Sequence, residues 1–374
     1  MRFTNIPGHS KLKERLATNI DEGRVPHAQL FVGEDGSGVL PLAIAYAQYL
    51  FCENKQGQDS CGECRSCKNI TAFNHPDLHF SFPFKLISKK NELAKTYISE
   101  WREQLSETPY FDLQDWNEKC AIGNSQPIIP EKEALEISTK LSLKSFEGGV
   151  KVLIVWHAEL MNATAANKLL KLIEEPPDKT VIILTTNQQD RLLKTITSRT
   201  QLVQVKRIMD ADLMEYLVGC EGLDSERAKS LVVESEGSYL KTRRQMISEN
   251  HHQYYFNHFQ TWMRLSYQKK VVETFNWAET ISGIGREQQK QFLQYCLKMI
   301  RQCILGNYTD MEMVKLHGEE REFMNNFSKF VNNKNVMQLT KEFNDAHYHI
   351  ERNANPKILF TDLSIKIIRL LRKQ

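Results

Sequence analysis

The sequence predicts an α/β domain with a parallel sheet, followed by a region that is entirely helical. Short apolar runs at 28–32, 152–155 and 181–184 have the composition and length of buried parallel strands. Helical patterns separate these runs, and strands that alternate with helices form a parallel sheet covered on both faces. From about residue 206 the strand signals end and helical periodicity takes over. The order of the patterns therefore indicates an α/β fold with added helical domains.

Three domains are expected: an α/β domain over 1–205, a small three-helix lid over 206–250 and an all-α domain over 251–374. The last of these ends in an apolar stripe made of Ile358, Leu359, Leu363, Ile367 and Leu370. Within the first domain, residues 80–128 fit the strand–helix rhythm poorly, although 91–105 has a helical pattern. We interpret 80–128 as an insertion whose role the sequence leaves open.

Length and charge limit the classes of protein that fit. The chain has 374 residues, enough for two or three domains with buried cores. Its formal net charge is +3, so a strongly basic surface for nucleic acid is not indicated. It has no run of about 18 apolar residues that could cross a membrane, and its first residues lack the apolar core of a signal peptide. We expect a cytoplasmic protein without membrane contact.

Residues 33–40, Gly-Glu-Asp-Gly-Ser-Gly-Val-Leu, have the spacing of a phosphate-binding P-loop between a strand and a helix over 41–50. A working loop ends in Lys, which reaches the phosphates, and Ser or Thr, which holds Mg²⁺. Val39 and Leu40 stand at these two positions and offer neither charge nor a metal ligand. The cofactor-binding candidates are therefore the glycines of a loop that we expect to be non-functional: Gly33, Gly36 and Gly38.

The second half of a P-loop ATPase site is missing as well. Such an enzyme needs a carboxylate at the end of the next core strand to hold Mg²⁺. Trp156 and His157 stand where Asp-Glu is needed, and Glu159 comes two positions late. We expect His157 to be a packed or surface residue, and we expect the chain not to hydrolyse ATP.

Four of the eight cysteines lie within sixteen residues, in the order Cys52-x8-Cys61-x2-Cys64-x2-Cys67. Four thiolates at this spacing are typical of a tetrahedral structural Zn²⁺ site. An iron–sulfur cluster or unliganded thiols remain alternatives. In ferredoxins, however, the Cys-x2-Cys-x2-Cys run is followed by a fourth cysteine and a proline, and neither follows Cys67 at that spacing. The tripeptide at 75–77 follows, and we expect a turn there in which Asp77 caps locally.

Several motifs together resemble the clamp-loader family of AAA+ proteins. They are Phe3-x2-Ile6-x-Gly8-His9, Gly23-Arg-Val-Pro-His27-Ala28, the loop at 33–40, Asn167-Lys-Leu-Leu-Lys171-x2-Glu174-Glu175-Pro176-Pro177, Leu192-Leu193-x-Thr195-Ile196-x-Ser198-Arg199 and Asn353-Ala-Asn355-Pro356. A zinc knuckle after the P-loop helix also occurs in bacterial clamp loaders. The resemblance covers most of the chain except 80–128. It is strongest to the branch that has lost both ATPase signatures and keeps the Ser-Arg pair, unlike the ATPase gamma/tau subunits and the delta subunit. Leu240 stands where an ATPase member has a sensor arginine.

The resemblance implies a non-hydrolysing stator in a five-membered ring that loads the sliding clamp onto primer-template DNA as part of a DNA polymerase holoenzyme. Its partners would be the gamma/tau and delta subunits, and through the complex the clamp and the DNA. Arg199 would act in trans as an arginine finger on a neighbour's ATP, with Ser198 orienting its loop. Alternatively, Arg199 pairs with a nearby carboxylate. Lys168 and Lys171 are either solvated or in contact with DNA phosphates. Residues 251–374 would form part of a collar.

Two readings remain as rivals to this function. One is an active P-loop ATPase of the clamp-loader type that recruits its lysine from elsewhere in the chain. The other is a zinc-dependent nucleic-acid-binding protein that contacts bases through its cysteine knuckle. The charges around the knuckle are mixed in sign, which does not favour the second reading.

Overall fold

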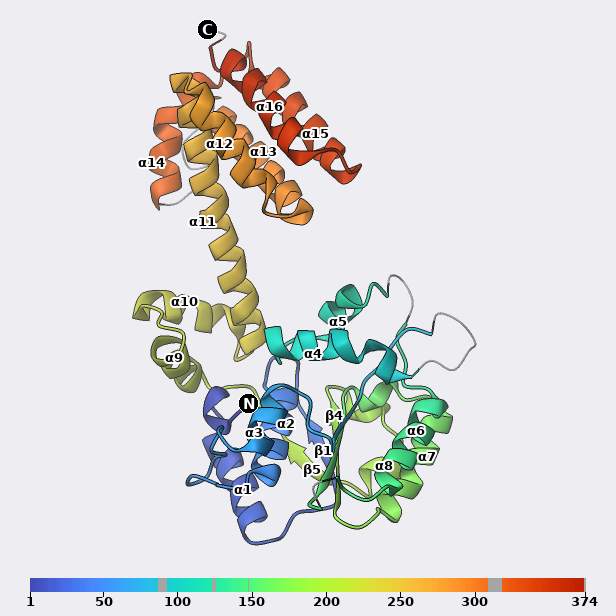
Figure 1. Cartoon of the computed structure of the whole chain (residues 1–374). Helices are drawn as coiled ribbons and strands as arrows, with labels where there is room; N and C mark the ends of the chain where they lie inside the picture. Colours follow the sequence, from blue (N-terminus) through green and yellow to red (C-terminus); the bar gives the residue numbers. More distant parts are fainter. Residues whose placement is uncertain (87–92, 123–125, 147, 309–317, 373–374) are drawn as a thin grey trace. The chain divides into compact units, whose positions relative to one another are not determined.

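The computed structural model describes the chain except residues 87–92, 123–125, 147, 309–317 and 373–374 (Figure 1). The chain divides into two compact units, Met1–Gln245 and Met246–Gln374. The first unit contains the sheet, and the second is helical throughout its described residues. The expected parallel α/β core followed by helices is therefore confirmed.

The sheet of the first unit has five parallel strands in the order β2-β3-β4-β1-β5. The strands are β1 (Ala28–Val32), β2 (Leu78–Ser81), β3 (Lys151–Val155), β4 (Thr180–Thr186) and β5 (Gln201–Gln204). β1, β3 and β4 coincide with the expected runs and are buried along their whole lengths. β2 and β5 were not expected, because each has only four residues and includes polar side chains.

Helices cover both faces of this sheet (Figure 1). The helical elements around the sheet are η1 (Phe3–Asn5), α1 (Ser10–Asp21), α2 (Val39–Phe51), α3 (Arg65–Thr71), α6 (Glu131–Ser142), η3 (Ala158–Leu160), α7 (Ala163–Glu174), η4 (Gln189–Arg191) and α8 (Lys194–Thr197), of which η1, η3 and η4 are single 3-10 turns. Successive residues of β1 point to opposite faces, as expected of a strand. Phe31 joins the core beneath α1 and α2, whereas Leu30 and Val32 join the core beneath α6 and α7. β1 is therefore buried on both faces, and its carboxyl end leads into the loop at 33–40.

Residues 80–128 begin inside β2 and continue through η2 (Ala94–Tyr97), α4 (Ile98–Glu107) and α5 (Leu113–Lys119). Two fully buried tryptophans, Trp101 and Trp116, hold this segment against the sheet. Trp101 stacks on Phe82 with the ring centroids 4.3 Å apart, and the Trp116 indole N–H donates to the Pro83 carbonyl at 2.7 Å. The segment is thus built into the main core of the first unit.

The Asp77 carboxylate holds a segment far away in the sequence, whereas the sequence predicted only a local cap. This buried carboxylate accepts hydrogen bonds from the Ser145 hydroxyl at 3.0 Å and the Phe146 amide at 2.8 Å. Lys151, also buried, donates to the carbonyls of Leu141 and, at 2.9 Å, Leu143. Two buried charged side chains therefore hold residues 141–146 at the end of α6.

The sequence after the sheet forms α9 (Asp210–Gly219), α10 (Ser225–Ser235) and α11 (Tyr239–Gln268). α11 continues without interruption past residue 250 and crosses from the first unit into the second. The remaining helices are α12 (Val271–Ser282), α13 (Arg286–Tyr308), α14 (Gly318–Phe327), η6 (Ser328–Phe330), α15 (Val336–Glu351) and α16 (Pro356–Leu370).

The core of the second unit is rich in aromatic side chains. Trp262 stacks on Trp277 with ring centroids 4.3 Å apart, and its indole N–H donates to Ser364 at 2.9 Å. Along α16 the buried stripe contains Phe360, Leu363, Ile367 and Leu370. Ile358 is 69% exposed, so its expected place in the stripe is wrong. It lies two residues before Phe360, which rotates it about 200° around the helix.

Candidate functional site: a filled P-loop, a cysteine cluster and a surface arginine

The loop at 33–40 has the backbone of a phosphate-binding turn. It follows β1 and leads into α2, whose N-cap is Gly38. Gly36 and Gly38 have φ angles of +86° and +96°, a conformation that favours glycine. Gly33 is required for a different reason, because a Cβ there would lie 2.4 Å from the Val205 carbonyl. The three predicted glycines therefore shape one tight turn at the carboxyl end of β1.

Aromatic side chains fill the space above this turn. The cavity lined by the loop has a volume of only about 30 Å³, roughly one water molecule. Tyr110 and Phe111, from the segment between α4 and α5, line it together with Trp156 from the end of β3, and each of the three is 5% exposed. The Phe111 and Trp156 ring centroids are 4.9 Å apart, and the Tyr110 hydroxyl lies 3.4 Å from where a Cβ on Gly38 would be. Pockets for ligands of cofactor size enclose about 300–1,000 Å³.

The start of α11 also holds the loop in place. The Ser238 hydroxyl donates to the Asp35 carbonyl at 3.1 Å, and the Tyr239 amide donates to the Gly36 carbonyl at 3.0 Å. Leu240 packs against Gly36, since a Cβ on that glycine would be 2.9 Å from the Leu240 Cβ. The position expected for a sensor arginine is therefore used for apolar packing against the loop.

The carboxyl end of β3 provides no carboxylate pair for Mg²⁺. His157 is buried, and its Nδ1 lies 2.6 Å from Oε1 of Glu159. The expectation of a packed histidine is confirmed for this residue. Its backbone has a φ of +51°, a left-handed conformation that is uncommon for a residue with a side chain.

The four predicted metal ligands come together. All four Sγ atoms lie within 4.8 Å of one another, with Cys52–Cys61 at 3.6 Å and Cys61–Cys67 at 3.9 Å. A tetrahedral ion with Zn–S bonds of 2.3 Å requires sulfurs about 3.8 Å apart. The amides of Cys64 and Glu63 donate to the Cys61 sulfur at 3.3 and 3.4 Å and lower the pKa of that thiol to about 6. The spacing and these N–H donors fit one thiolate-bound ion.

The cysteine cluster is attached to the N-terminus and to α2. The Asp59 carboxylate accepts hydrogen bonds from the amides of Phe3 and Thr4, both at 3.0 Å. Beside it, the Gln48 side-chain amide donates to the Ser60 hydroxyl at 2.9 Å. The knuckle therefore holds the first residues of the chain onto the helix that follows the P-loop.

Arg199 follows α8 on the surface of the first unit and is not among the residues that line the P-loop cavity. Its Nε lies 2.6 Å from Oε1 of Glu174, and the two side chains are 43% and 46% exposed. One guanidinium nitrogen donates to the Ser198 hydroxyl at 3.4 Å and to the Thr195 carbonyl at 3.2 Å. The alternative pairing of Arg199 with a carboxylate is thus present, and Ser198 contacts the guanidinium.

The two lysines of α7 lie on its exposed face. Lys168 is 3.9 Å from Glu131, at the edge of ion-pair distance. The cap of this helix is the Asn162 side chain, which accepts from the Ala165 amide at 2.8 Å. Lys168 and Lys171 are therefore available to an external partner.

Comparison with known proteins identifies the family. A family model described as DNA polymerase III, delta subunit, matches residues 8–209. The chain belongs to this DNA polymerase III family. The delta-prime subunit of Bacillus subtilis is 31% identical over 208 residues, 56% of this chain and 50% of the relative. The delta-prime subunit of Escherichia coli is 33% identical over 189 residues, 50% and 45% of the two chains. These relatives confirm the delta-prime branch as the one that this chain resembles.

A more distant relative carries another subunit name. The tau/gamma subunit of Haemophilus influenzae is 24% identical over 215 residues, 58% of this chain and 25% of the relative. The chain spans about half the length, or less, of the relatives that it matches. None of the helices in the described part of this chain is long and apolar enough to cross a membrane.

Sequence reasoning missed the residues that fill the loop. Tyr110 and Phe111 lie in the sequence Thr-Pro-Tyr-Phe-Asp, which gives no sign of which distant surface it covers. The one available signal was the density of aromatic residues in 80–128, where aromatics are too frequent for an exposed surface segment. It predicts burial of the segment but not its position above the loop.

Proposed function

We propose that this chain is a non-hydrolysing stator subunit of a DNA polymerase III clamp loader. The observation that carries the proposal is a P-loop turn whose phosphate space is filled by the chain's own aromatic side chains. ATP cannot share a cavity of about 30 Å³ with Tyr110, Phe111 and Trp156. The same observation disfavours the alternative of an active ATPase. A subunit that does not switch with nucleotide provides a fixed body against which ATP-bound neighbours move.

Within this proposal Arg199 is the arginine finger in trans. Its present partner, Glu174, is exposed, and pairs of this kind contribute only about 0–1 kcal/mol. Exchange of Glu174 for a phosphate on a neighbouring subunit therefore costs little in stability. A planar guanidinium then stabilises charge on the transferring phosphoryl group, and such fingers are worth about 10³–10⁵ in turnover. Ser198 positions the guanidinium through the contact that it already makes.

The other parts of the chain receive structural roles. A Zn²⁺ ion held by the four sulfurs of Cys52, Cys61, Cys64 and Cys67 stabilises the knuckle and has no open position for catalysis. Residues 206–250 act as a lid that is locked onto the loop, and 251–374 form a share of the collar. The partners are gamma/tau, delta, the sliding clamp and primer-template DNA reached through the complex, in the cytoplasm. The mixed charges of the knuckle make a nucleic-acid-binding module the weaker alternative.

The test is the clamp- and DNA-stimulated ATPase rate of the loader reconstituted with this chain. We expect Arg199→Ala to lower turnover at the one ATP site that borrows it by about 10³-fold or more, which appears as a clear fall in the total rate of the loader while assembly is unchanged. Arg199→Lys is expected to recover only part of it, because an ammonium lacks the planar fork. Arg191→Ala is the matched control, since Arg191 is a nearby exposed arginine. Equal turnover for Arg199→Ala and Arg191→Ala in an assembled loader would refute the finger.

A further inference from the structure

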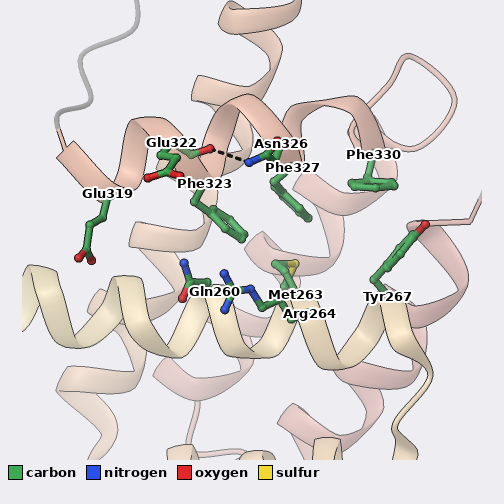
Figure 2. Close-up of a pocket in the computed structure, with 10 residues that line it drawn as sticks. All are labelled: Gln260, Met263, Arg264, Tyr267, Glu319, Glu322, Phe323, Asn326, Phe327 and Phe330. Carbon is green, nitrogen blue, oxygen red and sulfur yellow. Dashed lines mark hydrogen bonds between the residues drawn. The ribbon is translucent and has the colours of Figure 1, made fainter.

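A groove of about 490 Å³ lies between α11 and the α14–η6 segment of the second unit (Figure 2). Phe327 on its wall belongs to the buried core of that unit, and nothing in the structure shows what would cover the groove. A smaller cavity of about 230 Å³ lies in the first unit, beside β2. This cavity has cationic side chains at its rim and unpaired main-chain groups beside it, which together indicate the kind of partner that it fits.

β2 is an edge strand, which pairs with β3 on one side and, among the described residues, has no strand on the other. The carbonyls of Asp77 and Ser81 accept hydrogen bonds from amides on the β3 side, at 2.9 and 2.8 Å. Main-chain groups alternate in direction along a strand, so those of Leu78 and Phe80 point to the free side. The Leu78 amide donates to the His75 carbonyl, whereas the amide and carbonyl of Phe80 have no hydrogen-bond partner among the described residues. This edge can therefore accept one more short strand.

Helices from both faces of the sheet border this edge. α4 packs into the core on one face through Trp101, and α6 packs into the core on the other face through Ile137. Ile98 of α4, Ile137 of α6 and Phe80 of β2 line the cavity between them. Pockets for ligands of cofactor size enclose about 300–1,000 Å³, so this smaller cavity fits only about one or two side chains. An extended segment that lies along β2 would direct alternate side chains toward α4 and toward α6.

The rim of the cavity is positively charged. Lys95 of η2 and Lys140 of α6 line it and share a single carboxylate, that of Glu136, at 3.7 and 3.6 Å. Arg102 also lines the cavity, and its hydrogen bonds to described residues go to carbonyl oxygens and not to a carboxylate. Glu133 is the acidic residue among those that line the cavity, and burial raises the pKa of its carboxyl group, which disfavours its ionised form. An occupant with negative charge is therefore favoured at this rim.

We propose that the free edge of β2 is a docking site for an extended acidic peptide segment of another protein. The segment pairs with the main chain of Phe80 and adds a strand to the sheet. Its apolar side chains face Ile98 on the α4 side, and its carboxylates face the α6 side, where Lys95 and Lys140 meet at Glu136. Main-chain hydrogen bonds supply affinity, while the cavity and the lysines select the side chains, as in other strand additions. The site uses no residue of the P-loop, the knuckle or the finger, so it does not depend on the proposed function.

Fluorescence anisotropy with the full chain tests the occupant directly. The probe is a labelled hexapeptide of alternating valine and glutamate, and we expect saturable binding below about 1 mM peptide. The same peptide with N-methylated backbone amides keeps its charge but cannot donate to a strand, so it is expected to bind at least about tenfold more weakly. A hexapeptide of alternating valine and lysine is expected not to bind. If the glutamate peptide does not bind, or if N-methylation leaves its affinity unchanged, the proposal is overturned, and the lysines then serve only to keep other strands off the edge.

Charge reversal on α6 tests the place of binding. Lys140→Glu is expected to weaken binding of the glutamate peptide by about tenfold or more, because like charges then face each other. Lys132→Glu is the matched control, with the same change on an exposed lysine of α6 that does not line the cavity. Equal affinities for the two variants overturn the proposal. Displacement of the peptide by about 10 mM inorganic phosphate at constant ionic strength also overturns it, because the cavity would then be a site for a small anion.

Discussion

Restoring the two missing P-loop side chains, with Val39→Lys and Leu40→Thr, leaves the aromatic rings of the neighbouring segment in the phosphate space. For ATP to enter, Tyr110 and Phe111 must leave their buried positions beside Trp156. Truncation of one buried aromatic ring costs about 3–5 kcal/mol, so displacement of two costs at least about 6 kcal/mol. We therefore predict that the double variant still fails to bind ATP.

The size of the effect follows from this displacement energy. Each 1.4 kcal/mol corresponds to a tenfold change in affinity, so about 6 kcal/mol removes roughly four orders of magnitude. A loop that would otherwise bind ATP at about 1 μM is then shifted to about 10 mM. Addition of Tyr110→Ala and Phe111→Ala to the double variant vacates the space and is expected to return affinity toward the micromolar range.

The assay is isothermal titration calorimetry of Mg·ATP into the isolated chain, with the free energy of unfolding of each variant measured in urea. Wild type and the Val39→Lys/Leu40→Thr variant are expected to show no heat of binding at 1 mM ATP. Only the fourfold variant, if it stays folded, is expected to bind. Micromolar binding by the wild type or by the double variant would refute the reasoning, because ATP would then coexist with Tyr110 and Phe111.

Three further predictions concern other parts of the first unit. Cys67→Ser is expected to reduce the zinc bound per chain, measured by mass spectrometry of the native protein. Cys220→Ser is the control and is expected to keep one zinc, because that thiol is exposed and outside the cluster. Equal zinc content in the two variants contradicts the site. Asp77→Ala removes the acceptor for two hydrogen bonds and is expected to lower the free energy of unfolding by about 2–4 kcal/mol in urea; a change below about 0.5 kcal/mol would exclude this anchoring role. Burial lowers the pKa of Lys13 from 10.5 to about 8, so the unfolded chain binds more protons between these values and stability rises with pH there. Lys13→Met lacks this rise in stability with pH. Its free energy of unfolding relative to wild type is therefore expected to be highest at pH 7 and to fall toward pH 10. A difference in free energy of unfolding that does not change with pH would contradict the pKa shift.

The sequence was most informative where short-range spacing determines structure. The apolar runs of β1, β3 and β4 and the intervals between the four cysteines depend on local pattern, and the structure contains them as expected. β2 and β5 escaped detection because four-residue strands with polar positions have too little periodicity. In α16 the sequence also failed to show that Phe360 faces the core and Ile358 does not, because several apolar residues in a row leave the buried face of a helix ambiguous.

Long-range partners were beyond the reach of sequence pattern. Glu174 was named within a motif, yet its ion pair with Arg199 depends on the return of the chain through β4 and α8. The carboxylate of Asp77 holds residues nearly seventy positions later, which no local turn preference predicts. The filled cavity also belongs to this class, because Tyr110 comes from outside the expected strand–loop–helix unit. Contacts of this kind follow from tertiary packing and require the fold.

The filled loop also restricts which sequences this protein can reach by gradual change. Val39→Lys alone would put an ammonium group next to a space of about 30 Å³ without a phosphate to pair with, which is unfavourable. Loss of Tyr110 or Phe111 alone would leave a cavity and cost about 3–5 kcal/mol, a large part of the stability of a typical domain. Whether the lysine is gained first or an aromatic ring is lost first, the single substitution does not give a stable protein that binds ATP. The packing of these rings therefore makes the loss of the nucleotide site hard to reverse in evolution, because descendants of this chain cannot regain the site by single substitutions.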